Sequence, residues 1–169
     1  MSSSPPVELV VASFDDPILT GLLAERGDRP VGARGRSGPM SGSPPVDAGV
    51  VFLVARQVSE PVGCAGLRRL GDDTAEVDRV YVRPEFRGRG ISRLLLAGVE
   101  ELARRRGFAV ARLEAGDLRT AGLYASSGYV RIAPFGRHPA RSVCFEKSLH
   151  VPIAGGTAGG RMSGPRAMP

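Results

Sequence analysis

The chain has 169 residues, of which 42% are hydrophobic and 24% charged, and it carries a formal net charge of +6. This composition is typical of a globular protein with a sizeable core, and an aromatic fraction of 5% with no Trp does not favour a platform for stacking nucleic-acid bases. Lys147 is the single lysine, so nearly all positive charge comes from arginine. Arginine suits an anionic ligand, but arginine-rich usage also follows from a high-GC genome, so charge alone identifies no ligand.

The N-terminal part predicts a strand, a helix and a long loop. Residues 7–14 (VELVVASF) have a strand-like composition. Residues 15–26 (DDPILTGLLAER) begin with Asp and Pro, which favour the start of a helix. Residues 27–49 are rich in Gly, Pro and Ser and have no apolar period, so they are predicted to form a flexible loop.

Three β-like segments come next, and the short polar turns between them predict an antiparallel meander. The segments are residues 50–57, 61–70 and 75–83. Regular alternation along the third segment would place its side chains on two faces. One face would carry Val77, Arg79 and Tyr81, and the other Glu76, Asp78, Val80 and Val82.

The second half predicts a long helix followed by shorter elements. Residues 90–106 carry an apolar stripe at helical spacing, and Gly107 follows as a stop. The stripe consists of Ile91, Leu94, Leu95, Val99, Leu102 and Ala103. The remaining elements are strands at 108–115, 129–135 and 141–149, a short helix at 118–127, and a low-complexity tail at 150–169. This order predicts a mixed α/β sheet in which the strands before and after the long helix are parallel.

Cysteine usage and the N-terminus bear on the compartment. Cys64 and Cys144 lie far apart in β-like segments and are predicted to be small buried residues, because no disulfide framework or metal-ligand spacing surrounds them. The start of the chain lacks the basic and apolar regions of a signal peptide, and no apolar run approaches the ~18 residues of a membrane span. We therefore expect a cytoplasmic protein.

The sequence RGRG lies between the third β-like segment and the long helix. The first N–H groups of a helix lack internal partners, and the helix dipole adds positive charge there, so a Gly-rich turn at this place predicts a phosphate site. Gly88 and Gly90 would allow a ligand to approach the backbone, while Arg87 and Arg89 add charge. The turn is neither a dinucleotide-binding G-x-G-x-x-G motif nor a Walker loop.

These residues resemble the pyrophosphate loop of the GNAT N-acetyltransferases, [R/Q]-x-x-G-x-[G/A], with Ser92 in place of the final Gly or Ala. The flanking AEVDRVYVRPEFRGRGISRLLL resembles the fourth strand and third helix of that family, and LYASSGYVRI resembles its LYxxxGF segment. The resemblance is clearest over residues 48–149 and implies one acetyltransferase domain over residues 1–149. It also implies a mixed central sheet of six or seven strands, with a V-shaped splay between the fourth and fifth strands and helices on its flanks.

The resemblance implies acetyl-CoA as co-substrate and no metal. The pyrophosphate would bind the backbone N–H groups of Arg87, Gly88, Arg89, Gly90, Ile91, Ser92 and Arg93. The pantetheine would extend like an additional strand along Val80, Tyr81 and Val82. Asp117 stands where family members often have an Asn that hydrogen-bonds the pantetheine, and an ionised Asp can accept a hydrogen bond but cannot donate one.

The resemblance also implies catalytic roles. Tyr124 matches the family's Tyr acid for the leaving thiolate, the alternative being a core Tyr. Glu76 is the candidate general base, directly or through a water, the alternative being a solvated strand Glu paired with an Arg; Asp78 is a second candidate. Glu114 could face the acceptor but is interpreted as the polar side of a strand, and His138 and His150 as exposed loop residues.

The implied reaction is direct attack of an amine on the acetyl group in a ternary complex. The acceptor would be a small-molecule amine or a protein or peptide amine, and the protein a monomer or homodimer. A non-catalytic acyl-CoA sensor and a basic nucleic-acid-binding module stay open as alternatives. For the latter, a phosphate-tracking stripe would consist of Arg83, Arg87, Arg89, Arg93 and residues 104–106, without a nucleic-acid-binding motif beside it.

Overall fold

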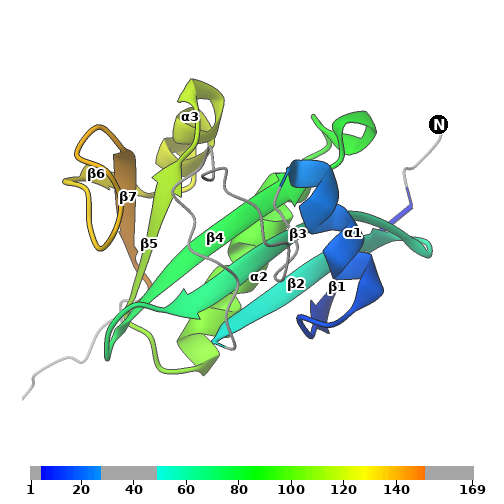
Figure 1. The fold of residues 1–169 in the computed structure, drawn as a ribbon, viewed down its shortest axis with the longest axis horizontal. Helices are drawn as coiled ribbons and strands as arrows, with labels where there is room; N and C mark the ends of the chain where they lie inside the picture. Colours follow the sequence, from blue (N-terminus) through cyan, green and yellow to red (C-terminus); the bar gives the residue numbers. More distant parts are fainter. Residues whose placement is uncertain (1–4, 28–48, 151–169) are drawn as a thin grey trace, which may run out of the picture.

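The computed structural model describes residues 5–27 and 49–150 (Figure 1). Their elements are β1 (Val7–Ala12), α1 (Pro17–Arg26), β2 (Val50–Gln57), β3 (Glu60–Arg69), β4 (Thr74–Val82), the 3-10 helix η1 (Pro84–Phe86), α2 (Ile91–Arg105), β5 (Val110–Ala115), α3 (Leu118–Ser126), β6 (Val130–Ile132) and β7 (Val143–Ser148). This order confirms the predicted mixed α/β fold. The predicted loop at 27–49 and tail at 150–169 lie, except for their end residues, outside the described residues.

One seven-stranded sheet contains all these strands, in the order β1-β2-β3-β4-β5-β7-β6. The pairs β1–β2, β2–β3 and β3–β4 are antiparallel, which confirms the predicted meander. β4 and β5 are parallel, as expected for strands joined through a helix. They pair only from Thr74–Val110 to Glu76–Arg112, and beyond this point they diverge (Figure 1). This divergence, called the split below, is the predicted V-shaped splay.

A β-bulge interrupts the pairing of β3 with β4. Gly66 pairs with Asp78 and Cys64 with Tyr81, so two residues of β4 lie opposite one residue of β3. Arg79, within the bulge, has a φ of 52°. The predicted regular alternation along β4 is therefore wrong beyond Asp78, because the extra residue inverts the period of two. As a result Val77 and Val82 both contribute to the core on the α2 side.

Two helices cover opposite faces of the sheet. On one face Leu95, Leu96 and Val99 of α2 pack against strand residues such as Val62 and Leu113. On the other face the buried leucines of α1 pack against β2 and β3 in a second cluster. The helical stripe of α2 is confirmed except for one position. Leu94 is 39% exposed, whereas Leu96 and Glu100, which the predicted stripe did not include, are buried, so the buried stripe is shifted around the helix.

Local signals set the ends of the helices. Asp16 caps α1 by accepting a hydrogen bond from the Ile18 N–H at 2.8 Å, Pro17 follows it, and Gly27 ends the helix with a φ of 98°.

The two cysteines are buried, as predicted, on the non-neighbouring strands β3 and β7. Over residues 5–27 and 49–150, no helix has both the length and the apolar character needed to cross a membrane.

Candidate functional site

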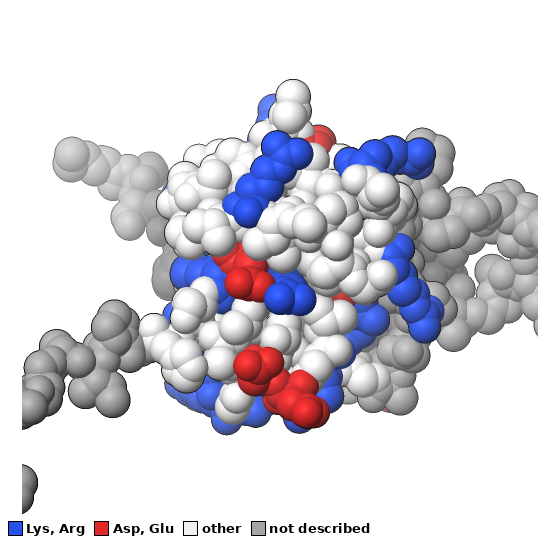
Figure 2. Space-filling view, turned by 90° about the vertical axis from the view of Figure 1, so that its left-hand side faces the viewer, with Lys and Arg blue, Asp and Glu red and all other residues white. Residues whose placement is uncertain are grey.

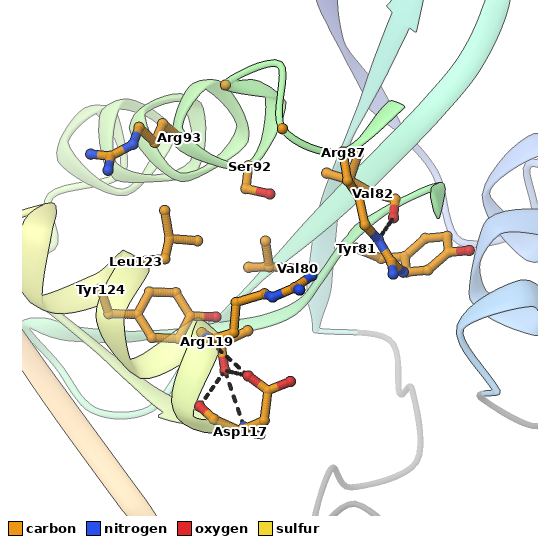
Figure 3. A pocket seen from close by; sticks show the side chains of 13 residues that line it. Val80, Tyr81, Val82, Arg87, Ser92, Arg93, Asp117, Arg119, Leu123 and Tyr124 are labelled. Carbon is orange, nitrogen blue, oxygen red and sulfur yellow. Dashed lines mark hydrogen bonds between the residues drawn. The ribbon is translucent and has the colours of Figure 1, made fainter. Parts of the chain in front are cut away.

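A cavity of about 460 Å³ lies beside the split, between β4, the start of α2 and α3 (Figure 3). β4 contributes Val80, Tyr81 and Val82 to its lining. The turn after β4 and the first turn of α2 contribute Arg87, Gly88, Gly90, Ser92 and Arg93. α3 and its cap contribute Asp117, Arg119, Thr120, Leu123 and Tyr124. The structure thus brings together most of the residues that the sequence assigned to one site.

The Gly-rich turn forms one wall of the cavity. Gly88 and Gly90 have φ values of 76° and 78°, and Gly90 is the N-cap of α2 without any side-chain cap. Non-glycine residues rarely adopt such positive φ values, so the conformation of the turn explains both glycines. The backbone N–H groups at the start of α2 lack helical partners and carry the positive end of the helix dipole. An anionic group fits this end of the cavity.

The arginines of the turn are divided between the cavity and the surface. Arg87 lines the cavity and donates from Nε to the Val82 carbonyl at 3.0 Å, and Arg93 donates to the Ser126 hydroxyl at 3.1 Å. Arg89 lies away from the cavity, because its guanidinium stacks on Phe86 and donates to the Glu85 carbonyl.

Ile91 is buried in the α2-side core, so its backbone rather than its side chain is available to a ligand at the turn.

Tyr124 is 5% exposed and points from α3 into the cavity, where Leu123 and Val80 lie beside it (Figure 3). Burial raises the pKa of its phenol to about 12, against an opposing effect of Arg26 and with smaller raising effects of Asp78 and Asp117. The hydroxyl therefore keeps its proton throughout the physiological pH range. It can donate a hydrogen bond to a group that gains negative charge in the cavity.

Asp117 lies at the rim of the cavity and caps α3. Its carboxylate accepts a hydrogen bond from the Thr120 N–H at 2.7 Å, and the Thr120 hydroxyl accepts one from the Asp117 N–H at 3.1 Å, which completes a capping box. The hydrogen bond from the Thr120 N–H lowers the pKa of this carboxyl. Oδ1 is thus already used within the helix cap.

Glu76 does not line the cavity. It is 3% exposed on the face of β4 that points away from α2. One carboxylate oxygen accepts a hydrogen bond from Arg68, and the other lies 2.7 Å from Nε2 of His138. Both oxygens are therefore engaged. The role of Glu76 as a base stays a prediction.

His138 contradicts its interpretation as an exposed loop residue. Its side chain is 7% exposed and lies between Glu76 and Glu114, whose carboxylate is 3.2 Å from Nδ1. Phe135 packs edge-on against the imidazole at a centroid distance of 4.8 Å. The sequence could not indicate this burial, because the contacts come from β4 and β5, which are distant along the chain. His150 is exposed, as predicted.

Sequence reasoning missed Arg119, Thr120 and Leu123 as cavity residues. Thr120, Leu123 and Tyr124 are spaced as i, i+3 and i+4 on α3, so they share one face of the helix. This spacing was the available signal, because Tyr124 was already assigned to the site.

The arginines proposed as a nucleic-acid stripe largely serve contacts within the fold. Arg83 pairs with Glu25 and Glu60, and Arg104 and Arg105 pair with Glu101. Figure 2 shows basic side chains interspersed with acidic and uncharged ones on the face beside β6 and β7. The described arginines of the stripe therefore do not favour a phosphate-tracking surface.

Solved structures of other proteins share this fold. A Klebsiella pneumoniae protein described as an acyl-CoA N-acyltransferase is 28% identical, with a TM-score of 0.69 over 85% of this chain and 98% of that one. N-acetylglutamate synthase from Neisseria gonorrhoeae, complexed with coenzyme A and N-acetyl-glutamate, is 19% identical, with a TM-score of 0.62 over 89% of this chain and 37% of that one. At 19% identity, the similarity to N-acetylglutamate synthase shows a shared fold and nothing more.

A curated relative gives a closer match in sequence over a shorter length. The "IAA acetyltransferase" of Azospirillum brasilense is 37% identical over 91 residues, which are 50% of this chain and 58% of the relative. The chain therefore spans less than two thirds of the length of that relative.

The family comparison covers the elements that build the cavity. The sequence model of the acetyltransferase (GNAT) family matches residues 43–129, slightly more than half of the chain. This segment contains β2 to α3, and with them the split, the Gly-rich turn and Tyr124. The agreement of sequence, sheet topology and cavity leads to one conclusion: the chain belongs to the GNAT acetyltransferase family.

Proposed function

We propose that the protein is an N-acetyltransferase that moves the acetyl group of acetyl-CoA to a primary amine by direct attack in a ternary complex. The cavity carries the proposal, because a helix N-terminus, an unpaired strand edge and a protonated Tyr converge there. These are a site for phosphate, a site for an extended amide chain and a hydrogen-bond donor for a leaving thiolate. Residues 1–149 would form the catalytic domain.

In the proposed complex, backbone N–H groups between Arg87 and Arg93 bind the pyrophosphate. Arg87, Arg93 and Arg119, all in the cavity lining, are placed to add positive charge. The pantetheine lies along Val80–Val82, where β4 continues beyond its last pairing with β5. Asp117 is a further contact, through the carboxylate oxygen that its helix cap leaves available.

The chemistry requires a neutral amine, a polarised thioester and an acid or hydrogen-bond donor for the thiolate. We assign the last role to Tyr124. A thiol has a pKa of about 8.5, so a phenol with a raised pKa stabilises the thiolate by a hydrogen bond and keeps its own proton. Glu76 is the proposed base.

The acceptor is a small-molecule amine or an amine of a protein or peptide, and the enzyme a monomer or homodimer. Among the similar proteins, one was solved with coenzyme A and N-acetyl-glutamate, and another is named an IAA acetyltransferase. Their names therefore do not select one acceptor for this chain.

The test is release of coenzyme A thiol from acetyl-CoA in the presence of a panel of primary amines, with binding of acetyl-CoA measured by calorimetry. Amine-dependent thiol release supports the enzyme. Binding without turnover for every amine would instead indicate a sensor. Salt-sensitive DNA binding without affinity for acetyl-CoA would contradict both.

A further inference from the structure

A cluster of side chains lies on the α1 side of the sheet, at the point where the split begins. Glu76 and Arg112 form the last pair between β4 and β5, and Glu114 follows two residues later on β5, on the same face as Arg112. The neighbouring β5 residues Leu113 and Ala115 belong to the α2-side core, which places Glu114 on the opposite face.

The loop between β6 and β7 spans this point. The Phe135 ring lies under the Arg112 guanidinium, with its centroid 5.7 Å from Cζ. His138 lies between Glu76 and Glu114. The histidine therefore connects the two strands across the closed end of the split.

The two ring nitrogens of His138 have unequal partners. Nε2 is 2.7 Å from Glu76, whose other oxygen already accepts from Arg68, so the hydrogen belongs on Nε2. Nδ1 is buried and 3.2 Å from a Glu114 oxygen, yet it has no hydrogen-bond partner among the described residues. A neutral imidazole presents a lone pair at this nitrogen, and an ionised carboxylate has no hydrogen to donate to it. One added proton on Glu114 would complete the chain of hydrogen bonds.

We propose that Glu114, His138 and Glu76 form a proton relay for the acceptor amine, with His138 as the positioning residue that links the two carboxylates. The proposal rests on the proposed function, since an ammonium must lose a proton before it can attack. Glu114 is the accessible end, because its side chain is 21% exposed against 7% for His138 and 4% for Glu76.

The proton transfer balances within these groups. The N–H bond of the acceptor ammonium breaks, its electron pair stays on nitrogen, and the proton passes to Glu114. From there it moves to Nδ1 of His138 while the Nε2 proton moves to Glu76. The nitrogen lone pair is then available to the acetyl carbon, and the relay returns its proton to solvent by the reverse path. Glu76 thus acts through Glu114 rather than by contact with the acceptor.

The ion pairs around the cluster distinguish Glu114 from the neighbouring carboxylates. The charged or titratable groups from the packed elements are Arg68 on β3, Glu76 on β4, Arg112 and Glu114 on β5, and Cys144 and Glu146 on β7. Arg68 pairs with Glu76, and Arg112 pairs with Glu146. Within the described part of the chain, Glu114 has no arginine partner, so its charge is the least compensated of the three carboxylates.

The test compares kcat/KM for amine-dependent thiol release in Glu114→Gln, His138→Gln and the wild type, from about pH 6 to about pH 10. Gln at position 138 can still donate to Glu76 but cannot pass a proton on. Near neutral pH both variants should lose about 10²-fold in kcat/KM, the usual contribution of a general base. The loss in kcat/KM should shrink toward pH 10, because about half of a primary amine with a pKa of about 10 is then neutral in solution.

Glu146→Gln is the matched control, since Glu146 is an arginine-paired carboxylate next to the relay but outside it. The kcat/KM of this variant should stay within about twofold of the wild-type value, as expected for the loss of a solvent-accessible ion pair. A loss that is constant at all pH values, or equally large in Glu146→Gln, would show a structural role and overturn the relay. Full activity of Glu114→Gln at neutral pH would overturn it as well.

The two levels of the proposal fail in different ways. Wild-type turnover together with unaffected variants would overturn the relay alone. A wild type that binds acetyl-CoA and acetylates no amine would overturn the proposed function, and the relay with it.

Discussion

At the scale of single residues, environment decides which groups can perform the proposed chemistry. Tyr124 and Tyr81 both line the cavity, but their hydroxyl groups differ. That of Tyr124 lies within the cavity, while that of Tyr81 points toward Glu25 on α1, 3.5 Å away (Figure 3). The pair therefore offers an internal comparison of a hydroxyl that faces the reaction with one that does not.

Tyr124→Phe should lower kcat by about 10²-fold and leave the affinity for acetyl-CoA unchanged, because it removes a donor needed only as the thiolate forms. Tyr81→Phe should leave kcat near the wild-type value. Steady-state kinetics and calorimetry give the two readouts. An unchanged kcat in the Tyr124 variant would remove this hydroxyl from the mechanism.

Asp117 should contribute to stability through its cap. Asp117→Ala should lower the free energy of unfolding by about 1 kcal/mol, whereas Asp117→Asn keeps the cap. Since the Thr120 N–H lowers the pKa of the folded carboxyl, its contribution is complete above the ordinary Asp range and is lost as pH falls through the lowered value. Urea unfolding at several acidic pH values tests this. Equal acid sensitivity of the Asn variant and the wild type would contradict it.

At the scale of elements, the cavity depends on how strands and helices end. β4 continues past its last pairing with β5, its bulge restores Val82 to the α2-side core, and the Gly-rich turn leads directly into α2. The ligand-facing groups in this arrangement are mostly backbone. Substitutions there should therefore act through charge and conformation more than through lost side chains.

Gly90→Asp and Gly90→Asn separate these two effects. Both side chains tolerate the left-handed conformation of the N-cap and have similar shapes, but only Asp brings negative charge to the proposed pyrophosphate site. The Asp variant should bind acetyl-CoA at least about 10²-fold more weakly than the Asn variant, because like charges about 4 Å apart repel strongly near a protein surface. Calorimetry measures the ratio. Equal affinities would mean that the phosphate lies elsewhere.

At the scale of the whole molecule, the sheet is covered by α1 and α2 on its two faces, and β3 lies in its interior, beside the central strand β4. Gly63 on β3 has no room for a side chain, because a Cβ there would lie 2.4 Å from the Tyr81 carbonyl oxygen on β4. Gly21, on the exposed side of α1, has no atom within 4 Å of such a position. The same substitution should therefore have opposite effects at the two sites.

Gly63→Ala should destabilise the protein by about 2 kcal/mol or more, since the clashing atom is backbone and cannot rotate away. Gly21→Ala should stabilise it by about 0.5–1 kcal/mol, the difference in helix propensity. Urea or thermal unfolding checks both values. A stable Gly63→Ala variant would show that β3 and β4 can separate locally.

Local rules were sufficient to predict the order of elements from the sequence. The Asp-Pro start of α1, the apolar period of α2 and the short turns of the meander depend on neighbouring residues, and all were confirmed except for Leu94 in α2. The Gly-rich turn and the strand before it predicted most of the cavity lining, because a turn between a strand and a helix fixes its own geometry.

What the sequence alone determined about this protein is its family, its element order and the backbone part of its site, since these follow from contiguous segments. Only the tertiary structure decided the bulge in β4 and the surroundings of Glu76, because both depend on strands and loops that meet from distant parts of the chain. His138 is the clearest case. It is separated from Glu76 by 62 residues, and no local period indicates that the fold buries it between two carboxylates.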